Sequence, residues 1–424
     1  MKKNRLHRHI VVQVVVALQE VFEQGLYADK VIERKFKENK KWGGRDRKFF
    51  AECLYDVVRW WRKYLKGLGI IWRDPSGPDR VSEKVLFHLV AAWAQDQGYE
   101  ISHIAELSDF DSLKYKKNLQ TLSPAEANSI PNWLEDLGME SLHRQKSQSP
   151  LANEVSHGVP WHEIIEAMNQ VALVFLRVNT LKVTRKDLLS ILADQGFLVE
   201  PDALVESAIR LKERANVFTS SSFKQGFFEV QDGGSQLIAP FLQVEPGHRV
   251  WDACAGAGGK SLHLAALMKN KGKIIASDIH DWKLNELKKR AKRDGVDVIE
   301  TKTIDSKWIK RQQAKFDRVL LDVPCSGLGV LKRNPDSKWK LSLQRIQELQ
   351  QIQQQILQEY QKTVKPGGKM VYATCSILPQ ENHLQIENFI RQNPQWTLED
   401  SHQIWPQKNG FDGFYMARMI NAGS

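Results

Sequence analysis

The strongest constraint on the fold is a regular alternation of strand-like and helix-like segments through the second half of this 424-residue chain. The apolar, strand-like runs are 249–253, 273–277, 296–303, 316–322 and 368–373, and the helix-like segments between them include 262–268, 282–294 and 343–363. Short strands that alternate with helices predict a doubly wound parallel sheet of the α/β class. We expect the tail, 413–420, to add a last strand at an antiparallel edge.

Two of these predicted strands lead into cysteines. Cys325 follows the run 316–322, and Cys375 follows the run 368–373. If the runs are neighbouring parallel strands, both thiols emerge at the carboxyl edge of the sheet, where open α/β folds bind ligands. A thiolate is a strong nucleophile, and its addition to carbon 6 of a cytosine would activate carbon 5 for methylation. Buried thiols that only fill space are the alternative, but the hydroxyl groups that flank Cys375 favour a chemical site.

A loop of small residues joins the first predicted strand of the sheet to its helix. The loop consists of Asp252, Ala253, Cys254, Ala255, Gly256, Ala257, Gly258, Gly259 and Lys260. Its end matches the end of a phosphate-binding P-loop, but the first glycine of that motif would fall at Cys254, so the match fails. The glycine spacing of a nicotinamide-binding fingerprint is absent as well. Small residues nevertheless let a backbone approach a bound ligand closely.

Two aspartates follow the next strands of the predicted sheet. Asp278 ends the second strand, where a carboxylate can accept hydrogen bonds from ribose hydroxyls, and Asp305 follows the third, within reach of an adenine edge. If the loop holds the amino-acid end of the ligand while the two aspartates bind its ribose and adenine, the pattern fits S-adenosylmethionine. Each aspartate alone would also suit a helix cap or a turn.

The N-terminal region is basic and helical. The chain has a formal net charge of +11, and residues 1–66 hold 17 Lys and Arg against 8 Asp and Glu. A basic surface favours polyanionic partners, although surplus charge also serves solubility. Apolar residues at helical spacing in 11–22 and 49–65 predict a small helical domain. The basic segment 35–48, with the nearby aromatic residues, could contact phosphates and bases, whereas Trp60 and Trp61 are also typical core residues.

The middle of the chain predicts a helical connector with a short linker at 147–150, followed by a small α+β module. The module combines strands at 172–178, 197–200 and 227–230 with a helix at 185–195. Arg177 and Asn179 share one face of the first of these strands, where they could contact a phosphate or point to solvent. We expect three domains: 1–125, 126–240 and 241–424.

Cysteine usage and hydropathy restrict the location of the protein. The 4 cysteines are scattered and include no CxxC pair, so neither a disulfide framework nor a metal site is expected. The basic start, 1–9, precedes an apolar run that continues into Gln19 without a small-residue cleavage site, which indicates a helix rather than a secretory signal. No apolar run reaches the roughly 18 residues of a membrane span. We expect a cytoplasmic protein without a membrane partner.

Several stretches of the chain resemble one known family. The stretches 252–260, 322–327, 332–339 and 372–382 are similar to motifs of the Fmu/Sun family of RNA 5-methylcytosine methyltransferases, and so are 176–179, 230–236 and 412–414. More loosely, the N-terminal helices resemble the NusB-like domain of bacterial members that modify small-subunit ribosomal RNA. The chain departs from the family pattern at Gly256 and Ala257, where alanine and proline are usual.

The resemblance implies a fold and a set of roles. The fold would be a Rossmann-like, S-adenosylmethionine-dependent methyltransferase sheet, preceded by a small α+β, RNA-recognition-like module and a helical RNA-binding domain. Cys375 would add to carbon 6 of the cytosine, Cys325 would help to eliminate the enzyme after methyl transfer, Asp322 would bind the target base beside the cofactor, and Lys260 would support the same pocket. The loop residues Asp252 and Cys254–Lys260 would hold S-adenosylmethionine together with Asp278, Asp305 and Asp322.

The expected activity is therefore methylation of carbon 5 of a cytosine in RNA, with small-subunit ribosomal RNA as the expected substrate and a monomer as the expected state. One alternative is a DNA cytosine methyltransferase that uses Cys325 as its nucleophile, but it leaves Cys375 unexplained. Another is a non-catalytic RNA-binding or ribosome-assembly factor that retains the fold. The complete set of Cys325, Cys375, Asp322 and Lys260 argues against it.

Overall fold

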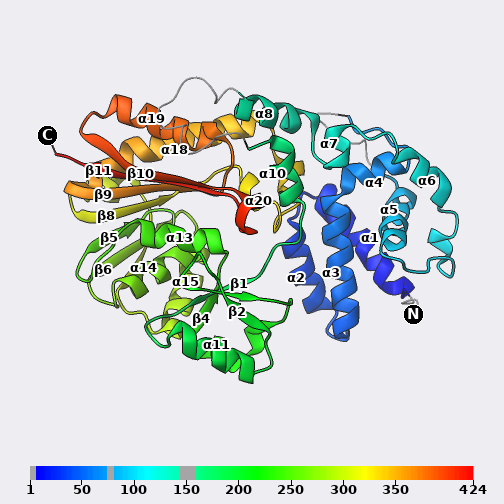
Figure 1. Ribbon diagram of the computed structural model, residues 1–424, viewed down its shortest axis with the longest axis horizontal. Helices are drawn as coiled ribbons and strands as arrows, with labels where there is room; N and C mark the ends of the chain where they lie inside the picture. The colour runs from blue at the N-terminus through cyan, green and yellow to red at the C-terminus, as the bar shows by residue number, and fades with distance from the viewer. Residues whose placement is uncertain (1–5, 74–80, 144–158, 424) are drawn as a thin grey trace. The chain divides into compact units, whose positions relative to one another are not determined.

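The computed structural model describes residues 6–73, 81–143 and 159–423 (Figure 1). The predicted linker at 147–150 lies outside these ranges. Contacts divide the chain into two compact units. The first consists of Met1–Glu140, Trp161–Gln170 and Leu331–Leu343, and the second consists of Ser141–Pro160, Val171–Val330 and Gln344–Ser424.

The first unit is helical, as predicted. It contains α1 (Arg8–Phe22), α2 (Ala28–Glu38), α3 (Gly44–Arg59), α4 (Trp61–Gly67), α5 (Glu83–Asp96), η1 (Ala105–Leu107), α6 (Ser112–Asn118), α7 (Pro124–Ala127), most of α8 (Asn132–His143), α10 (Trp161–Met168) and α17 (Ser337–Lys340). The predicted helix at 49–65 is divided between α3 and α4 at Trp60. Trp61 is buried and stacks on Phe22, with ring centroids 3.7 Å apart, so it is a core residue.

The segment Leu331–Leu343 belongs to this helical unit, although it lies far along the chain within 241–424. The buried Lys338 anchors it, because its Nζ donates to the Arg59 carbonyl at 2.8 Å and to Asn169 Oδ1 at 3.2 Å. Trp339 Nε1 donates to the Val58 carbonyl at 2.7 Å. Burial strongly lowers the pKa of Lys338, since the charged form has lost its water. The helical unit is therefore completed by a stretch that local sequence reasoning assigns to the sheet domain.

A seven-stranded mixed sheet organises the second unit, in the order β10-β11-β9-β8-β5-β6-β7. Its strands are β5 (Arg249–Asp252), β6 (Lys273–Asp278), β7 (Ile299–Thr303), β8 (Phe316–Asp322), β9 (Val364–Thr374), β10 (Trp396–Ile404) and β11 (Phe414–Asn421). The five strands from β5 to β9 pair in parallel, which confirms the α/β prediction. The tail forms the antiparallel strand β11, but its predicted place at the edge is wrong. It lies between β9 and β10. The edge strand β10 escaped prediction because much of it is polar and partly exposed.

Helices cover both faces of this sheet (Figure 1). They are α13 (Gly233–Phe241), α14 (Gly259–Leu267) and α15 (Asp281–Asp294) on one face and α18 (Leu343–Tyr360) and α19 (His383–Gln392) on the other, and the short elements are α16 (Ser306–Lys310), α20 (Pro406–Asn409), η4 (Leu328–Val330), η5 (Gln361–Thr363) and η6 (Pro379–Glu381). Successive strand residues alternate between two cores, since Val250 packs with the first group of helices and Trp251 with the second.

The small α+β module is a four-stranded antiparallel sheet in the order β2-β3-β1-β4. Its elements are β1 (Phe175–Val178), α11 (Arg185–Asp194), β2 (Val199–Pro201), β3 (Ala208–Leu211), η3 (Val217–Thr219), α12 (Ser221–Lys224) and β4 (Phe228–Val230). All four residues of β1 are buried. Leu176 and Val178 pack with α11, whereas Phe175 joins the core beneath α13. Both faces of β1 are therefore covered.

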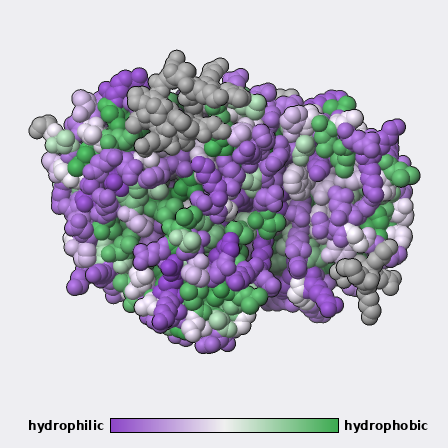
Figure 2. Space-filling model, in the orientation of Figure 1, coloured by the Kyte–Doolittle hydropathy of each residue, from purple (hydrophilic) through white to green (hydrophobic). Residues whose placement is uncertain are grey.

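Figure 2 shows a face of the molecule on which hydrophilic residues dominate and apolar residues are scattered. Within the described ranges, no helix combines the length and the apolar character that crossing a membrane requires.

Candidate active site

The two predicted cysteines lie side by side at the carboxyl edge of the sheet. Strands β8 and β9 are neighbouring and parallel, with Asp322 opposite Ala373, as the sequence predicts. The Sγ atoms of Cys325 and Cys375 are 3.3 Å apart, and both residues are partly exposed. Cys375, followed by burial, raises the pKa of the Cys325 thiol well above its ordinary value. The pair can therefore hold one neutral thiol as a hydrogen-bond donor to the other sulfur.

A buried carboxylate, Glu381, ties the two cysteine loops together. It accepts hydrogen bonds from the Ser326 amide at 2.8 Å, from the hydroxyls of Ser326 and Ser376, and from Gln353 Nε2 at 3.1 Å. Glu381 is completely buried. Each serine directly follows one of the two cysteines, so a single side chain fixes both loops. The sequence placed Glu381 in a motif but gave it no role, and its position six residues after Cys375 was the only available signal.

Lys260 and Asp322 form an ion pair beside the thiols. Lys260 Nζ lies 2.6 Å from Asp322 Oδ2, and both residues are largely shielded from solvent. Burial acts to lower the pKa of Lys260, but Asp322 outweighs it, so the pKa is raised. Cys375 contributes in the same direction. The structure thus brings together four of the predicted site residues, Cys325, Cys375, Asp322 and Lys260.

The small-residue loop leads from β5 into α14 as predicted. Gly258 has φ +84°, and a Cβ there would lie 2.0 Å from Leu287 Cδ1, so packing against α15 requires glycine. Gly256 has φ +55°, but a Cβ there would meet no atom within 4 Å. The Gly256 amide donates to Asp278 Oδ2 at 3.0 Å. The loop therefore packs closely on one side and stays open at Gly256.

The three predicted aspartates occupy different environments. Asp278 lies at the end of β6 beside two exposed apolar residues, Ile279 and Trp282, which sequence reasoning did not single out. Asp305 is exposed and caps α16 by accepting from the Trp308 amide at 2.7 Å. Asp252 is fully buried beneath the loop.

Asp252 has one hydrogen-bonded oxygen and one without a partner among the described residues. Oδ2 accepts from Ser261 Oγ at 2.6 Å, whereas Oδ1 is buried and unpaired. Burial raises the pKa of Asp252 to about 7. Its carboxyl group therefore supports the first turn of α14 and is protonated far more readily than an exposed aspartate.

Asp252→Asn will stabilise the protein relative to wild type in a pH-dependent way. The folded protein retains the Asp252 proton up to about pH 7, whereas the unfolded chain loses it near the ordinary value of 3.8. The contribution of Asp252 to the free energy of unfolding therefore decreases as pH rises between these values. The variant does not show this decrease, because an asparagine side chain does not titrate. We expect the difference in the free energy of unfolding to grow by about 2–4 kcal/mol from pH 4 to pH 8. Urea unfolding across this range measures it, and a pH-independent difference would contradict it.

Arg177 and Asn179 correct a prediction. The sequence predicted that both side chains contact a phosphate or point to solvent, but both residues are buried. Asn179 Nδ2 donates at 2.8 Å to the carbonyls of both Gly226 and Asp294. Arg177 donates to Gln231 and to the Gly259 carbonyl.

Among the residues the structure describes, no group of three or more His, Cys, Asp or Glu could hold a metal ion.

The predicted basic segment of the helical unit borders a hollow of about 510 Å³. The residues that line it are His9, Lys37, Glu38, Asn39, Lys40, Lys41, Trp42 and Asp46. Trp42 is almost fully buried and packs against Phe50 with ring centroids 5.1 Å apart. Its ring therefore belongs to the core, and the lysines carry the positive charge of this surface.

The parallel-dominated sheet, the glycine loop after β5 and the paired cysteines at the sheet edge fit a Rossmann-like methyltransferase fold. The crystal structure of PH0851 matches 99% of this chain with a TM-score of 0.76 at 23% identity, over 100% of that chain. A methyltransferase homolog protein from Pyrococcus horikoshii matches 66% of this chain and 98% of its own, with a TM-score of 0.57 at 27% identity. NSun6 from the same organism, solved with SFG, has a TM-score of 0.58 at 19% identity and matches 62% of this chain and 94% of its own.

The chain belongs to the RsmB/F family of 16S rRNA methyltransferases, which confirms the resemblance. The family model for 16S rRNA methyltransferase RsmB/F matches residues 239–420, and the model for the RsmF/B-like ferredoxin-like domain matches 154–218. A probable ribosomal RNA small subunit methyltransferase B from Synechocystis is 30% identical over 92% of this chain and 91% of its own. The methyltransferase B of Salmonella paratyphi B is 37% identical over 61% of this chain and 62% of its own.

Proposed function

We propose that this protein methylates carbon 5 of a cytosine in small-subunit ribosomal RNA, with S-adenosylmethionine as the methyl donor. The observation that carries the proposal is the pair of thiols, 3.3 Å apart, at the sheet edge next to the glycine loop. A single thiol would suffice to add to a pyrimidine. A second thiol in contact with the first supports a reaction that must also release the adduct. The names of the two relatives support ribosomal RNA as the substrate.

In this mechanism the Cys375 thiolate adds to carbon 6 of the cytosine, and the new carbon–sulfur bond makes carbon 5 nucleophilic. Lys260, whose pKa is raised by Asp322 and also by Cys375, supplies a positive charge near the attacking sulfur. After carbon 5 takes up the methyl group, Cys325 accepts the proton of carbon 5. The electrons of the carbon 5–hydrogen bond restore the double bond between carbons 5 and 6, and the Cys375 sulfur leaves carbon 6 as a thiolate. Cys325 starts this cycle as a neutral thiol, in line with its raised pKa, and releases its proton to solvent, to which it is partly exposed, before it serves as the base.

Asp322 is proposed to bind the target base while Lys260 holds its carboxylate in place. A cytosine can reach this edge only if it is unstacked and turned out of the RNA, so the proposal implies base flipping. Because the ion pair with Lys260 holds the Asp322 carboxylate in place, binding to it would orient the base with little further loss of entropy at the reaction step.

The residues of the loop fit S-adenosylmethionine, which supplies an electrophilic methyl group when bound. The backbone at Gly256 is open, Asp278 stands beside it, and the exposed side chains of Ile279 and Trp282 offer an apolar surface of the kind that an adenine ring covers. The proposed cofactor residues are Asp252, Cys254, Ala255, Gly256, Ala257, Gly258, Gly259, Lys260, Asp278, Asp305 and Asp322. In this set Asp252 is proposed to act indirectly, because it is buried under the loop and holds the first turn of α14 by accepting a hydrogen bond from Ser261.

The helical unit is proposed to bind RNA through its basic surface. The excess of positive charge in residues 1–66 would add affinity that does not depend on sequence and weakens with salt. The domain limits 1–125, 126–240 and 241–424, a monomeric state and a cytoplasmic location stay predictions.

Incubation with small-subunit ribosomal RNA, both naked and as the subunit, and methyl-labelled S-adenosylmethionine will produce 5-methylcytidine. Digestion of the RNA to nucleosides and mass spectrometry identify the product. Cytosine-rich DNA serves as the matched alternative substrate. Transfer to DNA alone, or a methyl group on another atom of the base, would contradict the proposal. Bound cofactor without transfer to either form of the RNA would favour a non-catalytic binding factor.

A further inference from the structure

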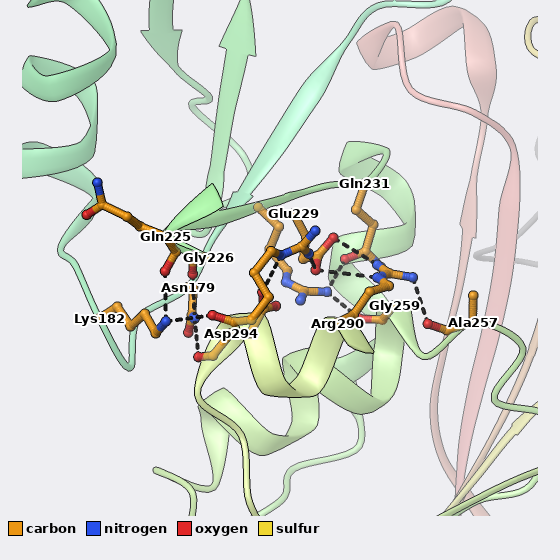
Figure 3. Close-up of polar contacts among 12 residues, drawn as sticks. Asn179, Lys182, Gln225, Gly226, Glu229, Gln231, Ala257, Gly259, Arg290 and Asp294 are labelled. Atoms are coloured by element: carbon orange, nitrogen blue, oxygen red, sulfur yellow. Dashed lines mark hydrogen bonds and ion pairs between the residues drawn. The ribbon is translucent and has the colours of Figure 1, made fainter. Parts of the chain in front are cut away.

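Two arginines from separate parts of the second unit hold the glycine loop by its carbonyl groups, and Figure 3 labels one of them, Arg290, with the loop residues Ala257 and Gly259. Arg177, on β1 of the α+β module, donates to the Gly259 carbonyl through Nη1. Arg290, on α15, donates to the Ala257 carbonyl at 2.7 Å through Nη1. The two carbonyls belong to alternate residues of the same loop. The loop is therefore fixed at two points by side chains that lie far from it in sequence.

A buried carboxylate forms an ion pair with Arg290, and its charge also acts on Arg177. Glu229 on β4 pairs directly opposite Arg177 in the module's sheet, and it accepts from Arg290 Nη2 at 2.9 Å and from Arg293. Burial acts to raise the pKa of Glu229, but Arg290 and Arg293 outweigh it, so the pKa is lowered. Burial lowers the pKa of Arg177 to about 10, so its guanidinium stays charged at neutral pH. Buried charges are costly unless they are paired, and Glu229 is paired with Arg290, which also donates to the loop.

The module and α15 are joined by hydrogen bonds and by one close backbone approach. Lys182 Nζ donates at 2.7 Å to the carbonyls of Gln225 and Arg293. At Gly226, which has φ +71°, a Cβ would lie 2.3 Å from the Arg293 carbonyl oxygen. Asn179 spans the same contact by donating to Gly226 and Asp294 (Figure 3). The α+β module is thus a rigid support for α15 and, through the two arginines, for the loop.

Holding these carbonyls also sets the direction of the amides that follow. A peptide group is planar and trans, so its N–H points away from its carbonyl oxygen. Because Arg177 fixes the Gly259 carbonyl, the Lys260 amide is directed to the opposite side, away from β1. This amide lies in the first turn of α14, where N–H groups favour an anionic ligand group.

We propose that Arg177 and Arg290 are positioning residues for the cofactor loop and that the α+β module thereby sets the affinity for S-adenosylmethionine. This inference rests on the proposed function, since it takes the loop as the cofactor site. Neither arginine touches the reacting atoms. Their loss will therefore weaken cofactor binding and raise the KM for the cofactor more than it lowers kcat at saturating cofactor.

Arg177→Met and Arg290→Met will each weaken binding of S-adenosylmethionine at least about tenfold, measured by calorimetry on the full chain without RNA. Arg293→Met is the matched control for the network, because Arg293 also binds Glu229 but donates to no carbonyl of the loop. Arg210→Met is the control for the module, because Arg210 pairs with Glu200 at the surface. Both controls will retain the wild-type dissociation constant within about twofold. Arg290→Lys, which keeps one donor, will recover part of the affinity.

Thermal unfolding of all five variants separates positioning from general stability. Wild-type affinity in Arg177→Met and Arg290→Met would overturn the inference. So would a loss of affinity that follows the melting temperature across all variants, with Arg293→Met included. A wild-type protein that binds the cofactor but methylates no RNA would refute the proposed function, and the dissociation constants of the variants would still decide the inference. A wild type that binds no cofactor would refute both.

Discussion

Cys375→Ala will abolish methyl transfer, whereas Cys325→Ala will stop after the transfer and accumulate a covalent protein–RNA adduct. The expected loss for Cys375→Ala is at least about 10³-fold, because in the proposed mechanism only the Cys375 sulfur forms the bond to carbon 6. In Cys325→Ala the Cys375 sulfur, which lies 3.3 Å from the missing thiol in wild type, can still add to the base. Without the second thiol the carbon 5 proton is removed slowly, so the adduct persists.

Denaturing gels of the two variants with labelled RNA and S-adenosylmethionine measure the adduct, and nucleoside analysis measures the transfer. The double variant must form no adduct. Cys53→Ala is the thiol control, because Cys53 is buried in the core of the helical unit. An adduct with Cys375→Ala and none with Cys325→Ala would exchange the two roles.

Glu381→Gln will lower kcat about 10²-fold and the free energy of unfolding by about 2–4 kcal/mol. Four hydrogen bonds converge on the buried carboxylate, two of them from Ser326 and one from Ser376. An amide of the same size must turn its NH₂ group toward one of these donors, which leaves buried polar groups unpaired. The loops that carry Cys325 and Cys375 then lose their common anchor, and small displacements of reacting groups are costly.

Cofactor affinity distinguishes this effect from general unfolding. None of these four hydrogen bonds comes from the glycine loop, so Glu381→Gln will bind S-adenosylmethionine as wild type does while it methylates slowly. Ser326→Ala and Ser376→Ala, which each remove one hydroxyl donor, will have intermediate rates. Glu359→Gln, at an exposed position on α18, is the charge control. Full activity in Glu381→Gln would show that the loops hold their positions without the carboxylate.

The features that could be predicted from sequence are those that local patterns encode. The apolar runs that became β5, β6, β8 and β9 are continuous because parallel strands are buried on both faces. Their order along the chain then placed Cys325 and Cys375 at one edge. The glycine loop was recognisable from its run of small residues, and two of its glycines, Gly256 and Gly258, have positive φ in the structure.

The features that could not be predicted depend on partners distant in sequence. Arg177 was expected to contact phosphate or solvent, since a strand pattern gives the face of a side chain but not what covers that face. Lys338 and its segment lie between two elements of the sheet domain but fold with the helical unit. Polar β10 forms the edge of the sheet only because β11 offers it free backbone groups.

The sequence by itself thus determined the sheet, the glycine loop and the proposed chemistry at the edge, because each follows from the period of its apolar residues or from a short motif. Only the tertiary structure decided how that chemistry is held in place. The burial of Glu381 between the cysteine loops and of Arg177 beneath Gly259 is compensated by donors and acceptors that are brought together only when the chain folds, so no local pattern could reveal it.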